Sequence, residues 1–256
     1  MRIYKYAGFL IISILTILSL ASLSCHAAAP SPFQEIDELL FEGENRQAWE
    51  ALEKLSSESS GDDEVQWRMA RTQYEIGRLS DSDAEALMHF QEAEKFARAA
   101  MSAAPDKSEG YKWLAIALGA QSKLIDTKSQ VEHSREIKEN IEKAITLAPD
   151  DDISYLVLSR WHYKMAGLGF FARIFVKLIY GGVPEASLKQ AEKLLIKAID
   201  LHDRITHRYN LAKVYNRMDR QEEAIAQLQL ALLIPVTFPE ESEELEKSRE
   251  KLEKWR

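Results

Sequence analysis

Residues 209–232 read YNLAKVYNRMDRQEEAIAQLQLAL, and this stretch decides the fold class. Apolar residues recur in it at helical spacing, with Ala212 and Tyr215 on one predicted face and Ala224 and Leu228 on a second. The sequence Met-Asp-Arg between them is a short turn. Because both alanines are small, the two helices can approach closely and pack antiparallel. The stretch therefore predicts a hairpin of two α-helices.

The same pattern recurs earlier in the chain with insertions. In ARAAMSAAPDKSEGYKWLAIAL and IEKAITLAPDDDISYLVLSRW, an alanine near a helix end is followed five residues later by Pro105 or Pro149. Each proline ends one helix, and Asp or Ser caps the next. The alanine spacings are 44, 54 and 33 residues, so two tetratricopeptide-type repeats carry insertions of roughly ten and twenty residues beyond the usual period. We predict an all-α, tetratricopeptide-like right-handed superhelix of antiparallel helix pairs, with the charged tail 239–256 as a solvated C-terminal capping helix.

Three phrases also carry a resemblance to a known family: GYKWLAIALG, ENIEKAITLAPDDDISYLVLSRWHYKMAGLGFFARI and YGGVPEASLKQAEKLLIKAI. The chain resembles the regulator of microtubule dynamics family from about residue 63 to residue 233. It departs from the family at Phe170, where Trp is usual, and at Val183-Pro184, where a Pro pair is usual. The resemblance implies a tetratricopeptide-like superhelical domain without enzymatic activity. Eukaryotic members are associated with microtubules or organelle membranes.

The first 27 residues have the pattern of a secretory signal peptide. Two basic residues precede an uncharged apolar run of 17 residues that ends at Leu23, and small residues follow. We expect cleavage after Ala27, which would leave residues 28–256 as a secreted or periplasmic repeat domain. Two alternatives stay open, an uncleaved membrane anchor and lipidation of Cys25. We interpret the chain as an exported bacterial member of the family, which would meet no microtubule, and we carry over the fold rather than that role.

The charge balance restricts the class of partner. The chain has 33 Lys and Arg against 41 Asp and Glu, a formal net charge of −8. A net acidic chain argues against nucleic acid as the main partner. The single cysteine lies in the predicted signal segment, so the mature domain would have no disulfide.

No constellation of catalytic residues is visible in the sequence. It has no phosphate loop, dinucleotide fingerprint or nucleophile elbow. None of the six histidines has the spacing that a zinc-binding helix uses. His202 and His207 flank a predicted turn, where we expect capping or surface roles. We therefore expect no enzymatic activity, no cofactor and no metal.

The first helix of each pair is expected to line a concave groove. Helical spacing places ten polar or aromatic residues there, and every charged one is positive: Arg68, Lys112, Arg160, Tyr163, Lys164, Tyr209, Asn210, Lys213, Asn216 and Arg217. Cations supply charge, amides supply hydrogen bonds to a peptide backbone, and tyrosines supply an apolar wall. These residue types predict a protein or peptide partner that is acidic or bears a carboxylate. The alternative is that these side chains only solvate the groove and pair with acids of the second helices.

Residues 168–180, LGFFARIFVKLIY, form a predicted amphipathic helix inserted into one repeat. It is too short to span a bilayer. Its apolar face consists of Phe170, Phe171, Ile174, Phe175, Leu178 and Ile179. That face would meet lipid, line an apolar pocket, or pack into the core, and we favour the core.

The sequence thus predicts a non-catalytic, exported scaffold that binds a peptide or protein segment in a basic concave groove. Two alternatives remain. The first is a lipid or hydrophobic-ligand carrier that uses the helix at 168–180. The second is a cytoskeleton-associated regulator, as the eukaryotic relatives are.

Overall fold

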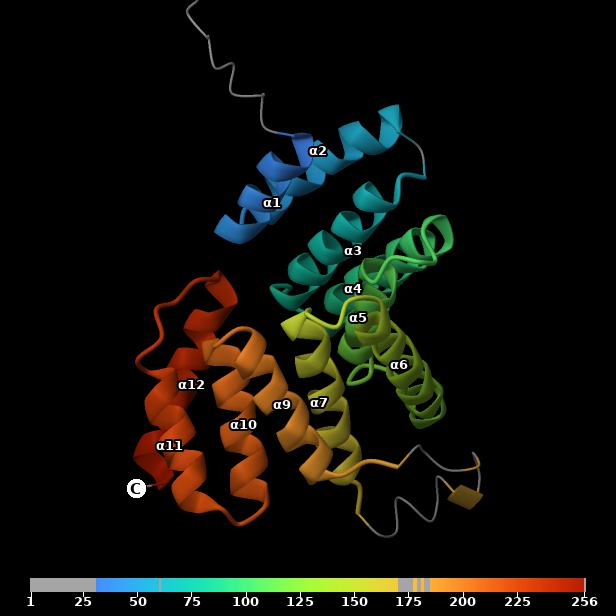
Figure 1. The fold of residues 1–256 in the computed structure, drawn as a ribbon. Helices are drawn as coiled ribbons and strands as arrows, with labels where there is room; N and C mark the ends of the chain where they lie inside the picture. The colour runs from blue at the N-terminus through green and yellow to red at the C-terminus, as the bar shows by residue number, and fades with distance from the viewer. Residues whose placement is uncertain (1–30, 60, 170–176, 179–180, 182–184, 256) are drawn as a thin grey trace, which may run out of the picture. The chain divides into compact units, whose positions relative to one another are not determined.

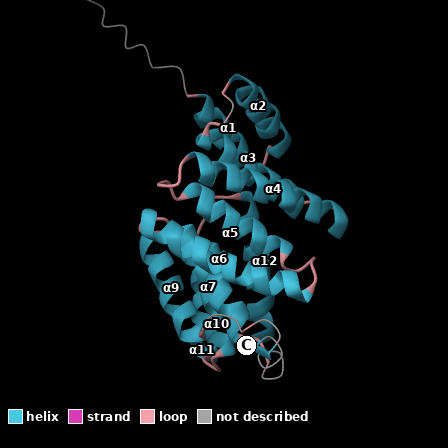
Figure 2. Ribbon diagram, turned by 90° about the vertical axis from the view of Figure 1, so that its right-hand side faces the viewer, coloured by secondary structure: helices cyan, strands magenta, loops and turns pink. Residues whose placement is uncertain are grey.

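Successive helix pairs make up the computed structural model, which describes residues 31–59, 61–169, 177–178, 181 and 185–255 (Figure 1). The helices are α1 (Pro32–Glu42), α2 (Asn45–Glu58), α3 (Asp63–Arg78), α4 (Asp83–Ala103), α5 (Glu109–Gln121), α6 (Thr127–Leu147), α7 (Asp152–Ala166), α9 (Leu188–Leu201), α10 (Ile205–Arg217), α11 (Gln221–Ala231) and α12 (Pro239–Trp255). Within these ranges no strand occurs (Figure 2). The predicted all-α fold of helix pairs is confirmed.

The helix boundaries follow the predicted local signals. Asp151 is the N-cap of α7, and its carboxylate accepts a hydrogen bond from the Ser154 backbone N–H at 3.2 Å. The Tyr111 and Tyr155 hydroxyls donate to the carbonyls of Pro105 and Pro149, each at 3.0 Å. These matching bonds show that the two proline-containing phrases are equivalent parts of successive repeats.

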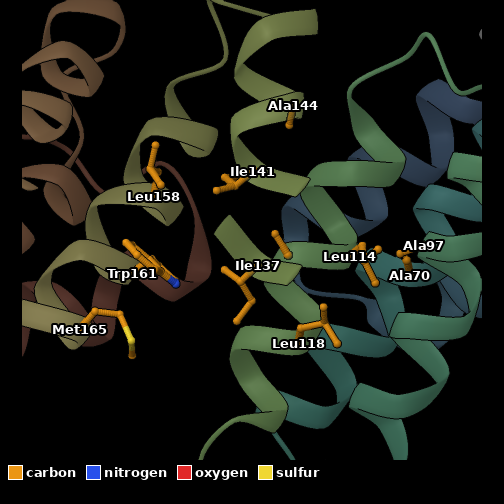
Figure 3. Packing of buried hydrophobic residues seen from close by; sticks show 11 residues of the cluster. Ala70, Ala97, Leu114, Leu118, Ile137, Ile141, Ala144, Leu158, Trp161 and Met165 are labelled. Carbon is orange, nitrogen blue, oxygen red and sulfur yellow. The ribbon is translucent and has the colours of Figure 1, made fainter. Parts of the chain in front are cut away.

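Alanines at the helix contacts allow a continuous core to run from α3 to α7 (Figure 3). Ala70, Ala97 and Ala144 are fully buried, and Leu114 belongs to the same buried cluster. At the far end, the Trp161 indole N–H donates to the Ser134 carbonyl at 2.7 Å, so its one polar atom is satisfied. The core therefore joins neighbouring repeats, as expected for units that bury their apolar faces on one another.

The first predicted insertion lengthens a second helix. α6 has 21 residues against 11 in α11, the second helix of the last pair. The second insertion lies between α7 and α9, where residues 170–176, 179–180 and 182–184 are outside the described residues.

Residues 31–256 form one compact unit. In the described part of the chain, no helix combines the length and apolar character needed to cross a membrane. The predicted signal segment, residues 1–27, lies outside the described residues, and its cleavage stays a prediction.

Candidate functional site

Lys213 of α10 lies against two tyrosine rings. Its Nζ is 5.2 Å from the ring centroid of Tyr163 on α7 and 5.4 Å from that of Tyr209. Both distances permit cation–π attraction. No carboxylate within the described ranges forms an ion pair with this ammonium group. Aromatic faces, rather than an acid, therefore hold the charge.

The surroundings of Lys213 lower its pKa to about 8. Burial is the largest cause, because it removes water from the ammonium group, and the charge of Arg160 acts in the same direction. Glu244 opposes the shift. An anion bound beside Lys213 would stabilise its charged form, so a bound carboxylate would raise the pKa of this lysine.

Arg217 adds a second cation to the Tyr163 ring. Its guanidinium carbon is 4.8 Å from the ring centroid, and its Nη1 donates to the Tyr163 carbonyl at 3.1 Å. A Cβ added at Gly167 would lie 2.2 Å from the Arg217 Nη2. Gly167, the C-cap of α7, therefore leaves the space that this guanidinium occupies.

Arg160 is the third cation, and it is paired with a distant acid. Its Nη2 lies 3.0 Å from Glu244 Oε1 on α12, and its Nε donates to the Asn210 side-chain oxygen at 3.4 Å. The Arg160 side chain is 45 % exposed, whereas that of Glu244 is 15 % exposed. We name Arg160, Lys213 and Arg217, with Tyr163 and Tyr209, the cationic cluster.

Arg68 was predicted to line the groove together with these residues, but it is buried in a contact between α1 and α3. Its guanidinium forms a bidentate pair with Asp37 at 2.7 and 2.8 Å, and its Nη1 lies 2.8 Å from Glu64. It also stacks on the rings of Phe33 and Trp67. Because its donors are already used within the fold, we leave Arg68 out of the cationic cluster.

The remaining predicted groove residues have different surroundings. Lys112 is buried and paired with Glu109 at 2.8 Å and Asp151 at 3.4 Å, so it too is left out. Lys164 is exposed in the last turn of α7, and Asn216 is half-buried on α10. The structure thus brings together Arg160, Tyr163, Tyr209, Asn210, Lys213 and Arg217.

The predicted apolar face of the inserted helix lies mostly outside the described residues. This applies to Phe170, Phe171, Ile174, Phe175 and Ile179. Leu178 is described and is 78 % exposed, so this one member of the face does not pack into the core.

A buried polar cluster connects the starts of α7 and α10. Asp152 receives the Arg204 Nε at 2.5 Å and lies 2.7 Å from His207 Nε2. Burial alone would raise the pKa of Asp152, but the hydrogen bonds from His207 and Arg204 outweigh it and lower this pKa to about 2. His207 is 0 % exposed, so the prediction of a capping or surface role for it was wrong. Its partner lies 55 residues away, in another repeat.

Sequence reasoning also missed the part that α12 takes in the site. The tail does cap the last repeat, but it is not wholly solvated, because Leu252 is buried against Tyr209, Ala212 and Leu228. One signal was available. Residues 239–246, PEESEELE, contain five glutamates and no Lys or Arg, which suits contact with a basic surface.

The described residues contain no group of three or more His, Cys, Asp or Glu that could hold a metal ion. Stacked helix pairs, alanine-lined contacts and polar side chains presented by the first helices define a tetratricopeptide-like helical-repeat protein. A solved tetratricopeptide protein of Thermus thermophilus, TTC0263, has the same fold, with a TM-score of 0.62 and 20 % identity. The similarity covers 88 % of this chain and 96 % of that one.

The family model for regulator of microtubule dynamics protein 1-3 matches residues 33–256, and the chain belongs to this family. Regulator of microtubule dynamics protein 3 of Xenopus laevis is 30 % identical over 182 residues, which is 70 % of this chain and 39 % of that protein. Regulator of microtubule dynamics protein 2 of Homo sapiens is 24 % identical over 223 residues, which is 86 % of this chain and 54 % of that protein. The matched part is therefore about half or less of each of these relatives.

Proposed function

We propose that this chain is a non-catalytic interaction scaffold whose cationic cluster binds an acidic segment of a partner protein. One observation carries the proposal. In a chain of net charge −8, Lys213 lies between tyrosine rings without an acidic partner among the described residues, and Arg160 and Arg217 lie beside it. Such a surface offers charge, directed donors and apolar walls to a carboxylate-bearing peptide.

The proposed place of action is outside the cytoplasm, after removal of residues 1–27. The basic start, apolar run and small-residue exit of this segment support it. Mass spectrometry of the expressed protein would give its N-terminal residue. A chain that keeps its first residues would contradict cleavage.

Charge reversal of the cluster tests the proposed partner class. In the double variant Lys213→Glu/Arg217→Glu, affinity for a labelled oligoglutamate peptide should fall by at least about tenfold, because attraction becomes repulsion. The measurement is fluorescence anisotropy. The double variant Lys193→Glu/Lys197→Glu on the exposed side of α9 makes the same change in net charge and should bind as the wild type does. Equal affinity in both double variants would contradict the proposed site.

The same binding should depend on pH through Lys213. Its pKa of about 8 means that it loses its charge as the pH rises above 8, whereas an ordinary lysine stays charged. Affinity for oligoglutamate should therefore decrease between pH 7 and pH 10. In Lys213→Arg the charge persists across this range, so a pH dependence that survives this substitution would place the titrating group elsewhere.

The names of the relatives supply a second candidate, a microtubule-related role. Cosedimentation of the protein with assembled microtubules tests it. Retention of the wild type in the supernatant at every microtubule concentration would count against it.

A further inference from the structure

The acidic half of α12, defined as residues 239–246, lies on the surface proposed to bind a partner. Glu244 reaches Arg160 of α7 at 3.0 Å and accepts a hydrogen bond from the Thr206 hydroxyl of α10. Glu243 lies 3.9 Å from Arg78 of α3. The Glu244 carboxylate of the chain itself is therefore already bound to Arg160, one of the three cations of the cationic cluster.

The segment just before the helix extends this contact to α1. The Phe238 ring meets the Phe41 ring edge-on at 5.1 Å, and the Arg204 guanidinium lies 4.8 Å from the Phe238 ring centroid. Glu241 accepts from the backbone N–H groups of Thr237 and Phe238 and so holds the turn into the helix. The start of α12 is thus in contact with α1, α3, α7 and α10.

The two halves of α12 are held by different forces. Leu252 in the second half is buried among apolar side chains, and Trp255 packs beside it. The first half is held by polar contacts and one aromatic contact: Glu243 and Glu244 pair with arginines, Glu244 accepts from the Thr206 hydroxyl, and the buried Glu241 holds the turn. Partly exposed ion pairs contribute little stability and compete poorly with other ions, whereas buried apolar area is retained. An external acid can therefore replace the ion pairs of the first half more readily than the apolar contacts of the second half.

We propose that the acidic half of α12 is an internal ligand of the cationic cluster, and that an external acidic segment binds by displacing Glu244 from Arg160. This inference rests on the proposed function, because it concerns the regulation of the same surface. Since the internal carboxylate is tethered, its effective concentration is high, and a partner must present several carboxylates together to displace it. The expected partner is an acidic protein segment that resembles PEESEELE in charge.

One test opens the contact. In Glu244→Gln, affinity of the full chain for a labelled oligoglutamate peptide should rise roughly fivefold, because Arg160 loses its competing partner. Glu253→Gln is the matched control, since it makes the same charge change on an exposed position of α12 and should bind as the wild type does.

A second test closes the contact. A Cβ added at Gly43 would lie 3.9 Å from the Pro239 Cβ, which is within the range that a disulfide spans. The variant Gly43→Cys/Pro239→Cys is made in a Cys25→Ser background, which removes the only native thiol. Gly43 has a φ of +81°, so the new cysteine is strained in both redox states, and only the oxidised and reduced forms of this one variant are compared. Oxidation should weaken oligoglutamate binding roughly fivefold, because the locked Glu244 can no longer be displaced from Arg160. The size is taken to equal that of removing this ion pair.

The outcomes separate the two proposals. Tighter binding by Glu244→Gln together with weaker binding by the oxidised form supports the internal ligand. If either of these two changes is absent while Lys213→Glu/Arg217→Glu still weakens binding as predicted, the internal ligand is overturned and the proposed function stands. If neither the wild type nor the reduced or Glu244→Gln forms bind the peptide, the acidic partner class itself is overturned.

Discussion

Gly110→Ala is expected to lower the free energy of unfolding by about 3 kcal/mol, because the added methyl group overlaps backbone rather than side-chain atoms. A Cβ at this position would lie 2.5 Å from the Met101 backbone nitrogen and 2.8 Å from its Cα. Gly110 is in the first turn of α5, where this helix crosses the end of α4. Backbone atoms within a helix cannot move aside locally, so the two helices would have to separate.

The control for this prediction lies on the same helix. A Cβ at Gly119 meets nothing within 4 Å, so Gly119→Ala should stabilise the protein by about 0.5–1 kcal/mol through helix propensity. Urea unfolding followed by circular dichroism measures both variants. Similar effects of the two substitutions would show that α4 and α5 do not approach as closely as the structure has them.

Asp152→Ala should lower the free energy of unfolding by about 3 kcal/mol at pH 7, because it removes the carboxylate that pairs with Arg204 and His207 inside the fold. Asp152 is almost fully buried and receives Arg204 and the fully buried His207. Asp126→Ala is the comparison. It removes an exposed N-cap carboxylate of α6 and should cost clearly less than Asp152→Ala.

The effect of Asp152→Ala should also depend on pH. The Asp152 pKa is lowered from an ordinary value near 3.8 to about 2 in the folded protein. A carboxyl group with a lowered folded pKa stabilises the protein above its unfolded pKa, and this contribution disappears as the pH falls through the folded pKa. About 2 kcal/mol of the difference between wild type and variant should therefore be lost between pH 5 and pH 2. A difference that stays constant over this range would refute the assignment.

Much of the fold could be predicted because its signals are short-range. Pro149 and Asp151 mark the end of α6 and the start of α7 within a few residues, and Ala212 and Ala224 mark a close helix contact. The candidate site was predicted less completely. Helical spacing grouped Tyr163, Lys213 and Arg217, which lie together in the structure, but it grouped Arg68 with them, and Arg68 lies elsewhere, paired with Asp37.

The difference lies in how far apart the interacting residues are in the chain. By itself the sequence determined the helix pairs, their alanine contacts and the excess of cations on the first helices, because each of these depends on neighbours a few residues away. Only the tertiary structure decided which of these cations are paired with acidic residues of the fold. Arg68 is paired with Asp37, 31 residues away, and Arg160 meets Glu244, 84 residues away. Such pairs form only when packing brings distant helices together, so no local pattern could predict them.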